Sequence, residues 1–133
     1  MDTYHLQIVT PDSMVYDGQA QSILLRTVNG DVCILPRHID FAAPLGIGMA
    51  RVTNEKGETR DAACNGGMVS VSRGEVRVMA ITFEWEDEID LERAKEAESR
   101  AEESLKTLQR EDRDFAAAEA KLRRALARIH VKE

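Results

Sequence analysis

Apolar and polar side chains alternate with a period of two through most of the first 83 residues. In residues 4–10, Leu6 and Ile8 fall on one face and His5 and Gln7 on the other. This alternation is typical of strands with one buried face. Further alternating segments are residues 22–28, 32–35, 50–53, 59–64, 68–72 and 76–83. Short strands joined by closely spaced turns predict an antiparallel β-sandwich or flattened barrel.

From Ile89 onward the apolar residues recur every three or four positions, which is the period of an amphipathic helix. One stripe consists of Leu91, Ala94, Ala97, Ala101, Leu105 and Leu108, and another of Phe115, Ala118, Leu122, Ala125 and Ile129. Narrow stripes rich in alanine let two helices approach closely, so we expect an antiparallel two-helix hairpin. Asp112 or Asp114 could cap the second helix. Because no glycine or proline forces a turn there, a nearly continuous helix is the alternative.

Glycine and proline divide the chain into two parts. All 3 prolines and all 8 glycines lie at or before Gly74, and none follows. Both residues are unfavourable inside helices and common in turns. We therefore predict a β plus α fold, with a β domain at residues 1–84 and a helical domain at residues 85–133.

Composition excludes several classes of protein. The chain carries 18 Lys and Arg against 24 Asp and Glu, a net charge of −6, which argues against nucleic acid as the main partner. Its apolar runs are far shorter than the roughly 20 residues that span a bilayer, and we expect no signal peptide. Cys33 and Cys64 are too few for a zinc site or a disulfide framework, so we expect two reduced, buried thiols.

Charge is distributed unevenly in the helical part, with acidic residues dominating 84–103 and only basic ones in 121–132. Acids at a helix start and bases at a helix end suit the helix dipole, which explains most of the pattern. The dipole does not explain a basic stripe at spacings of three and four, where like charges repel. This stripe consists of Lys121, Arg124, Arg128 and Lys132. We predict that the basic stripe faces an anionic ligand or an acidic protein surface.

The segment 89–94 is the best candidate for binding a small molecule. Asp90 is placed to cap the first helix, which puts Arg93 in its first turn. A cation there faces the positive end of the helix dipole, and a bound anion would remove that penalty. In a hairpin, Arg124 and Arg128 could converge on the same anion. The simpler alternative, which the spacing favours, is a surface ion pair between Arg93 and a neighbouring glutamate.

No catalytic constellation is apparent in the sequence. The Gly-Ile-Gly at 46–48 lacks the third glycine and the following helix of a dinucleotide motif, and predicts a turn or bulge. The histidines His5, His38 and His130 are scattered, and no serine, histidine and aspartate share the context of a nucleophile elbow. We therefore expect no catalytic residue and no metal site.

Five segments occur in the order of one known family: YHLQIVTP at 4–11, GDVCILPRH at 30–38, GGMVSV at 66–71, IDLERA at 89–94 and LRRALARI at 122–129. Through them the whole chain resembles the epsilon subunits of bacterial F-type ATP synthases. The resemblance implies a β-sandwich followed by two helices, as the periodicity also predicts. An unrelated β-sandwich adaptor with a helical tail, serving another complex, is the alternative.

The resemblance implies a non-catalytic rotor subunit, peripheral at the cytoplasmic face of the bacterial plasma membrane. Its β domain would bind the gamma subunit and the c-ring, and the subunit would help couple proton-driven rotation to ATP synthesis. The helical domain would be regulatory. Folded onto the β domain it would permit turnover, and extended along gamma, toward the catalytic alpha and beta subunits, it would block ATP hydrolysis.

The resemblance also implies particular site residues. Asp31 would face the c-ring and His38 would contact a neighbouring subunit. No cofactor is required, but in some members the folded-down helices bind ATP, alone or with Mg²⁺, as a regulatory ligand. The matching positions are Glu84, Ile89, Asp90, Arg93, Ala94, Arg124 and Arg128. The basic stripe would hold phosphate in one state and face acidic residues of a catalytic subunit in the other.

Two positions depart from the family pattern, because Arg37 and Cys33 stand where glycine is usual. If either position requires a positive φ, a side chain would be strained there and the local turn would differ. This bears on the roles assigned to Asp31 and His38.

Overall fold

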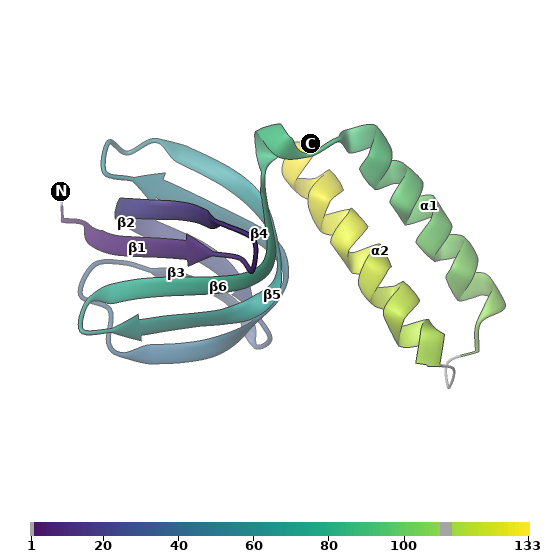
Figure 1. The fold of residues 1–133 in the computed structure, drawn as a ribbon, viewed down its shortest axis with the longest axis horizontal. Coiled ribbons are helices and arrows are strands. Elements are labelled where there is room, and N and C mark those ends of the chain that lie inside the picture. Colours follow the sequence, from purple (N-terminus) through teal and green to yellow (C-terminus); the bar gives the residue numbers. More distant parts are fainter. Residues whose placement is uncertain (1, 110–112) are drawn as a thin grey trace.

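The computed structural model describes residues 2–109 and 113–133, which form a β-barrel beside a pair of helices (Figure 1). The elements are β1 (Tyr4–Val9), β2 (Met14–Thr27), β3 (Gly30–Ile34), β4 (Phe41–Asn54), β5 (Thr59–Ser72), β6 (Glu75–Trp85), the 3-10 turn η1 (Glu86–Glu88), α1 (Leu91–Thr107) and α2 (Arg113–Lys132). No described helix has the length and apolar character needed to cross a membrane.

The strands form one sheet that closes on itself. The hydrogen-bonded order is β1-β6-β5-β4-β2-β3, and β1 also pairs with β2, so that five strands make a ring and β3 extends β2. This confirms the predicted flattened barrel. All pairs are antiparallel except β1 and β6, which are parallel. A ring of five strands cannot alternate direction throughout, so one pair has to run parallel.

Three strands are longer than the alternation predicted, since β2, β4 and β5 each contain 14 residues. The two segments expected at 59–64 and 68–72 are one strand, which passes through Gly66 and Gly67 with positive φ angles of 64° and 116°. The two glycines interrupt the apolar alternation but do not end the strand, which is why the alternation predicted two separate strands. Likewise, Gly46 and Gly48 lie inside β4, where its pairing with β2 shifts register.

Buried aliphatic side chains fill the barrel. Those with no or almost no exposed surface are Leu6, Ile8, Ile23, Leu25, Ile34, Val69 and Val78. Leu6 and Ile8 are the inward positions that the alternation predicted, and burial of each such side chain contributes about 1.5–3 kcal/mol to folding.

The two cysteines differ in their surroundings. Cys64 is buried, and this burial raises the pKa of its thiol to about 12. Cys33 is exposed, so the prediction of two buried thiols was wrong for this residue. Its neighbours Val32 and Ile34 pack toward the core, and a strand turns the residue between them outward.

The helices form an antiparallel pair, as predicted (Figure 1). The apolar stripes are the buried or half-buried positions of α1 and α2, with Ala94, Ala101, Ala118 and Ala125 the most buried. Because Leu108 is extended, α1 ends there and the alternative of one continuous helix is wrong. Asp114 lies in the first turn of α2, and Asp112 lies outside the described residues.

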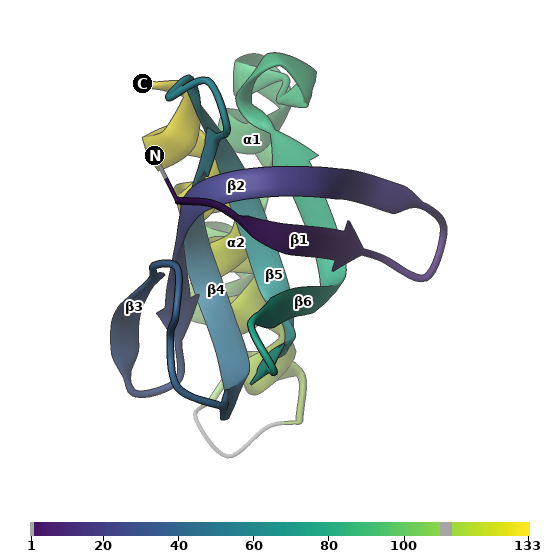
Figure 2. The same cartoon turned by 90° about the vertical axis from the view of Figure 1, so that its left-hand side faces the viewer.

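It is α2 that packs against the barrel, on the outer side of β4 and β5, while α1 lies beyond it (Figure 2). The buried apolar cluster at this contact is small. It consists of Ala63, Ile89 and Val131, with Met49 packed against them, and is separate from the barrel core. The helical pair therefore rests on the barrel through a limited surface.

Candidate functional site

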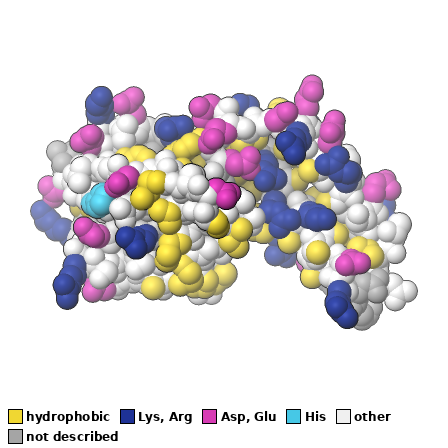
Figure 3. Space-filling view, in the orientation of Figure 1, with side chains coloured by type: hydrophobic (Ala, Val, Ile, Leu, Met, Phe, Trp, Pro, Cys, Tyr) yellow, Lys and Arg dark blue, Asp and Glu magenta, His cyan; other side chains and the backbone are white. Residues whose placement is uncertain are grey.

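A cleft of about 650 Å³ lies between α1 and α2. Its lining residues are Ala97, Arg100, Ala101, Ser104, Thr107, Leu108, Asp114, Ala117, Ala118, Lys121, Arg124 and Arg128. Alanines keep the helices close and leave room between them. Among the described residues, four cations and one carboxylate line this space. Figure 3 shows Lys and Arg side chains gathered where the helical pair adjoins the barrel. The charge of the cleft suits an anionic ligand.

Three members of the basic stripe, Lys121, Arg124 and Arg128, line this cleft. The fourth, Lys132, does not: its Nζ donates a hydrogen bond to the backbone carbonyl of Glu86 at 3.2 Å. Among the described residues, Lys121 and Arg124 take part in no ion pair. Two of the stripe's cations are thus available to a ligand.

Arg100 completes the basic wall from α1 and is not among the site residues predicted from the sequence. Like Lys121 and Arg124, it makes no ion pair with any residue that the structure describes. A signal for it was present, since Arg100 follows Arg93 by seven residues, which is about two turns of one helix face. Only the packing of the helices shows that this face meets Arg124.

The first turn of α1 has the capped geometry that was predicted. The Asp90 carboxylate accepts a hydrogen bond from the backbone N–H of Arg93 at 3.2 Å. Ile89 and Ala94 are 5% and 3% exposed, so both are packing residues. These contacts fix where the helix begins.

The Arg93 side chain itself is exposed. Within residues 2–109 and 113–133 it forms no ion pair, so the expected pairing with a neighbouring glutamate is absent. It does not line the cleft either. Its Cα lies four residues before Ala97, the first lining residue, which is about 6 Å along the helix. The structure therefore brings Arg124 and Arg128 together and leaves Arg93 one turn beyond the end of the cleft.

Glu84, at the end of β6, links the barrel to α2. Its Oε1 accepts a hydrogen bond from Nε of Arg128 at 2.5 Å, and both side chains are about one-third exposed. Together with the hydrogen bond from Lys132 to the Glu86 carbonyl, this ion pair holds the C-terminal end of α2 against the segment where the chain leaves the barrel. A partly exposed pair of this kind contributes about 0–1 kcal/mol. The contact can therefore be broken at modest cost.

Asp31 and His38 lie on the barrel, away from the cleft. The Asp31 carboxylate accepts a hydrogen bond from Nε of Arg26 at 2.5 Å. Nδ1 of His38 lies 2.8 Å from the carbonyl oxygen of Ile39, and its ring meets Phe41 edge-on, with centroids 5.6 Å apart. No three His, Cys, Asp or Glu side chains of the described residues are grouped to hold a metal ion.

Of the two departures from the family pattern, only Arg37 occupies a position with positive φ, at 66°. This left-handed conformation costs a residue with a side chain about 1–2 kcal/mol. The Arg37 guanidinium donates to the Asp2 carboxylate at 2.8 Å, but is itself 84% exposed. Cys33 lies inside β3 and has no such strain. Arginine thus takes up the backbone conformation that glycine adopts most easily.

An apolar patch that was not predicted from the sequence covers part of the outer face of β5 and β6. Met68 and Met79 are cross-strand partners, 40% and 43% exposed, and Ile81, 60% exposed, follows on the same face of β6. Hydrophobic side chains gather on this side of the barrel in Figure 3. Exposed apolar patches of this kind are typical of interaction sites. The sequence feature that could have predicted this patch is the presence of apolar residues on both faces of β6.

Comparison with protein families gives two matches that together span the chain. Residues 3–86 match the family described as ATP synthase, Delta/Epsilon chain, beta-sandwich domain, and residues 87–133 match its long alpha-helix domain. Proteins named ATP synthase epsilon chain are similar over almost the full length. Those of Halalkalibacterium halodurans and Bacillus licheniformis are 43% and 41% identical, each over 98% of both chains. That of Exiguobacterium sp. is 33% identical over 100% of this chain and 98% of its own.

Two solved structures share the fold. A chain of the Euglena gracilis mitochondrial ATP synthase, in an assembly of OSCP, F1 and c-ring, aligns with a TM-score of 0.80 at 21% identity, over 93% of this chain and 79% of the other. A chain from the central stalk and c-ring of the Tetrahymena thermophila mitochondrial ATP synthase aligns with a TM-score of 0.62 at 12% identity, over 97% and 96%. At these identities the likeness concerns the fold.

Proposed function

Because the chain belongs to the family of ATP synthase delta and epsilon chains, we propose that it is a non-catalytic central-stalk subunit of a bacterial F-type ATP synthase. The full-length similarity to bacterial epsilon chains supports this function over that of an adaptor in another complex. In this role the subunit lies at the cytoplasmic face of the plasma membrane. It contacts gamma and the c-ring and helps couple rotation to ATP synthesis.

The apolar patch of Met68, Met79 and Ile81 is the surface that we assign to the gamma subunit. It lies on a rigid sheet, and burying it against a partner removes exposed apolar area from water. Asp31 is assigned to the c-ring and His38 to a neighbouring subunit. Both side chains are accessible enough for such contacts, although Asp31 would have to share its carboxylate with Arg26.

Met79→Glu is expected to weaken association with gamma about tenfold or more, because it places a charge in the middle of an apolar contact. Leu126→Glu is the matched control, since Leu126 is also exposed, at 45%, but lies on α2. Copurification with gamma and the unfolding temperature should be measured for both variants. Undiminished copurification of a folded Met79→Glu variant would exclude the patch as the gamma contact.

We assign the cleft between the helices to regulatory ATP. The observation that carries this assignment is that Arg100, Lys121 and Arg124 meet around a space of about 650 Å³ and that none of the three forms an ion pair with a described residue. Arginine forks match phosphate oxygens in pairs, and the volume is typical of small-molecule sites. A Mg²⁺ ion would be held by the phosphates more than by the protein.

The remaining predicted residues have supporting roles in this site. Asp90 fixes the start of α1, and Ile89 and Ala94 pack its first turn, so that Arg93 lies one turn beyond the end of the cleft, from where its side chain can extend toward a bound nucleotide. Glu84 holds Arg128 in place. These residues position the helices, and the cations at 100, 121 and 124 would carry the phosphate.

ATP would act by shifting a conformational equilibrium. A ligand that bridges α1 and α2 binds only the hairpin, and it therefore favours the folded-down state by its difference in affinity for the two states. Without ATP, release of the Glu84 pair would let α2 leave the barrel. The basic stripe of the extended helices would then face acidic residues of a catalytic subunit and block ATP hydrolysis.

Isothermal titration with MgATP tests the ligand. The wild-type chain is expected to bind one ATP, and Arg124→Ala to bind at least about tenfold more weakly, since a hydrogen bond to a charged group contributes about 1.5–3 kcal/mol. Arg123→Ala is the control, because Arg123 is exposed and paired with Glu119 at 3.6 Å. If millimolar ATP gave no heat with the wild-type chain, the sensing role would be lost and only the stalk role would remain.

A further inference from the structure

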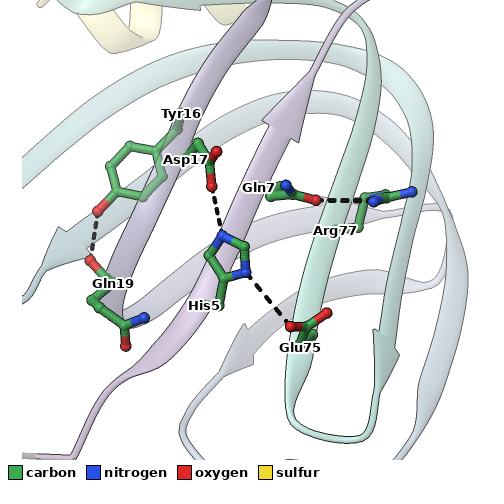
Figure 4. Close-up of polar contacts among 7 residues, drawn as sticks. All are labelled: His5, Gln7, Tyr16, Asp17, Gln19, Glu75 and Arg77. Atoms are coloured by element: carbon green, nitrogen blue, oxygen red, sulfur yellow. Dashed lines mark hydrogen bonds and ion pairs between the residues drawn. The ribbon is translucent and has the colours of Figure 1, made fainter.

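His5 lies between two carboxylates on the outer face of β1, where the barrel closes (Figure 4). Its Nε2 is 2.5 Å from Oδ1 of Asp17 on β2, and its Nδ1 is 3.7 Å from Oε1 of Glu75 on β6. The imidazole therefore joins β1 to both of its neighbours in the ring. Asp17 and Glu75 lie about 12 and about 70 residues after His5 in the sequence, so no local sequence pattern predicts these contacts.

The protonation state of His5 decides whether both contacts can form. An ionised carboxylate only accepts hydrogen bonds, and a neutral imidazole has a single N–H to donate. With neutral His5, one ring nitrogen would turn a lone pair toward a carboxylate. The imidazolium donates to Asp17 from Nε2 and carries its positive charge 3.7 Å from the Glu75 carboxylate, so it alone interacts favourably with both carboxylates.

The other charged groups around His5 do not replace this arrangement. On β6, Arg77 donates two hydrogen bonds to Oε1 of Gln7, at 3.0 and 3.2 Å, instead of pairing with Glu75. Arg73, in the turn between β5 and β6, lines the same hollow as His5 but forms no ion pair with a described residue. On β2, the Tyr16 hydroxyl donates to the backbone carbonyl of Gln19.

Of the pairings that close the ring of described strands, the one between β1 and β6 has the fewest paired residues. The parallel register between β1 and β6 extends from Leu6 with Val76 to Val9 with Met79, and so does not reach His5. Beyond this register, the side chain of His5 reaches β6 through Glu75, whereas the link between Gln7 and Arg77 lies within it. A change in that link is therefore expected to affect how firmly β1 is held.

We propose that His5, Asp17 and Glu75 form a proton-operated clasp, in which protonation of His5 ties β1 to β2 and β6 and deprotonation loosens the barrel seam. The hydrogen bond with Asp17, with a further contribution from Glu75, raises the pKa of His5 above its usual value. A pKa raised on folding means that the stabilisation is complete below about pH 6.5, the value for an unfolded chain. It is lost as the pH rises through the higher pKa of the folded chain.

Thermal unfolding and amide hydrogen exchange of the full chain, followed from pH 5.5 to pH 8.5, test the clasp. For the wild type we expect the unfolding temperature to fall above neutral pH, and the exchange-protection factors of β1 amides to fall several-fold. His5→Gln should flatten this dependence, because glutamine cannot gain a proton, and Glu75→Gln should reduce it. His38→Gln should keep the wild-type profile, since His38 faces Phe41 instead of a carboxylate.

Titration of the His5 ring by NMR gives a second, independent readout that does not rely on stability. We expect its pKa to lie above the value for an unfolded chain and to drop in Asp17→Asn. The clasp would be disproved by parallel stability profiles of wild type and His5→Gln. It would equally be disproved by a His5 pKa that does not change in Asp17→Asn.

Discussion

Replacing Gly67 by alanine is expected to unfold the barrel or to destabilise it by about 4 kcal/mol or more, a large part of a typical domain's stability. Gly67 has φ 116°, and a Cβ there would lie 1.9 Å from the carbonyl oxygen of Met79 and 2.8 Å from Cα of Ala80. Both obstructing atoms belong to the backbone of β6, which cannot rotate away as a side chain can. Accommodating one methyl group therefore means separating β5 from β6. Circular dichroism during chemical denaturation measures the loss.

Gly74→Ala separates this clash from the backbone strain. Gly74 also has a positive φ, of 80°, but apart from its two chain neighbours no described residue has an atom within 4 Å of the position of its Cβ. Alanine there carries only the cost of the left-handed conformation, about 1–2 kcal/mol. If the two variants had equal denaturation midpoints, the close approach of β5 and β6 at Gly67 would be refuted.

Ala125→Asp is expected to separate α1 and α2 from each other and from the barrel, while the barrel stays folded. Ala125 has no exposed surface, and it lies seven residues after Ala118, on the α2 face that meets α1. A carboxylate at this position loses its hydration, at a cost of several kcal/mol, and its short side chain cannot reach solvent. The helices rest on the barrel through a small apolar contact, so their separation relieves the charge more cheaply than global unfolding does.

Hydrogen exchange measured by peptide mass spectrometry distinguishes these outcomes. Protection of α1 and α2 should fall to near that of an unfolded segment, while β5 and β6 stay protected. Ala116→Asp makes the same change at an exposed position of the same helix and should leave protection almost intact. Unchanged protection of α1 in Ala125→Asp would mean that the alanine stripe does not hold the pair together. According to the proposed function, this variant should also lose ATP binding.

Several features could be predicted from the sequence because they depend on residues close together in the chain. The inward positions of Leu6 and Ile8 follow from the alternation of a strand, and the alanine stripes follow from the period of a helix. The cap at Asp90 involves a residue only three positions away, and the structure confirms it. Glycine misled the prediction in β5, where the chain passes through Gly66 and Gly67 without ending the strand.

The sequence by itself determined where the strands give way to helices, which faces are apolar and where α1 begins, since backbone periodicity and capping are local. Tertiary structure decided the parallel seam, since five strands in a closed ring cannot alternate direction throughout. It also placed Arg100 of α1 opposite Arg124 of α2, and His5 between Asp17 and Glu75. Such sites join side chains that are distant in the chain, and their chemistry exists only once packing has brought the charges within reach of one another.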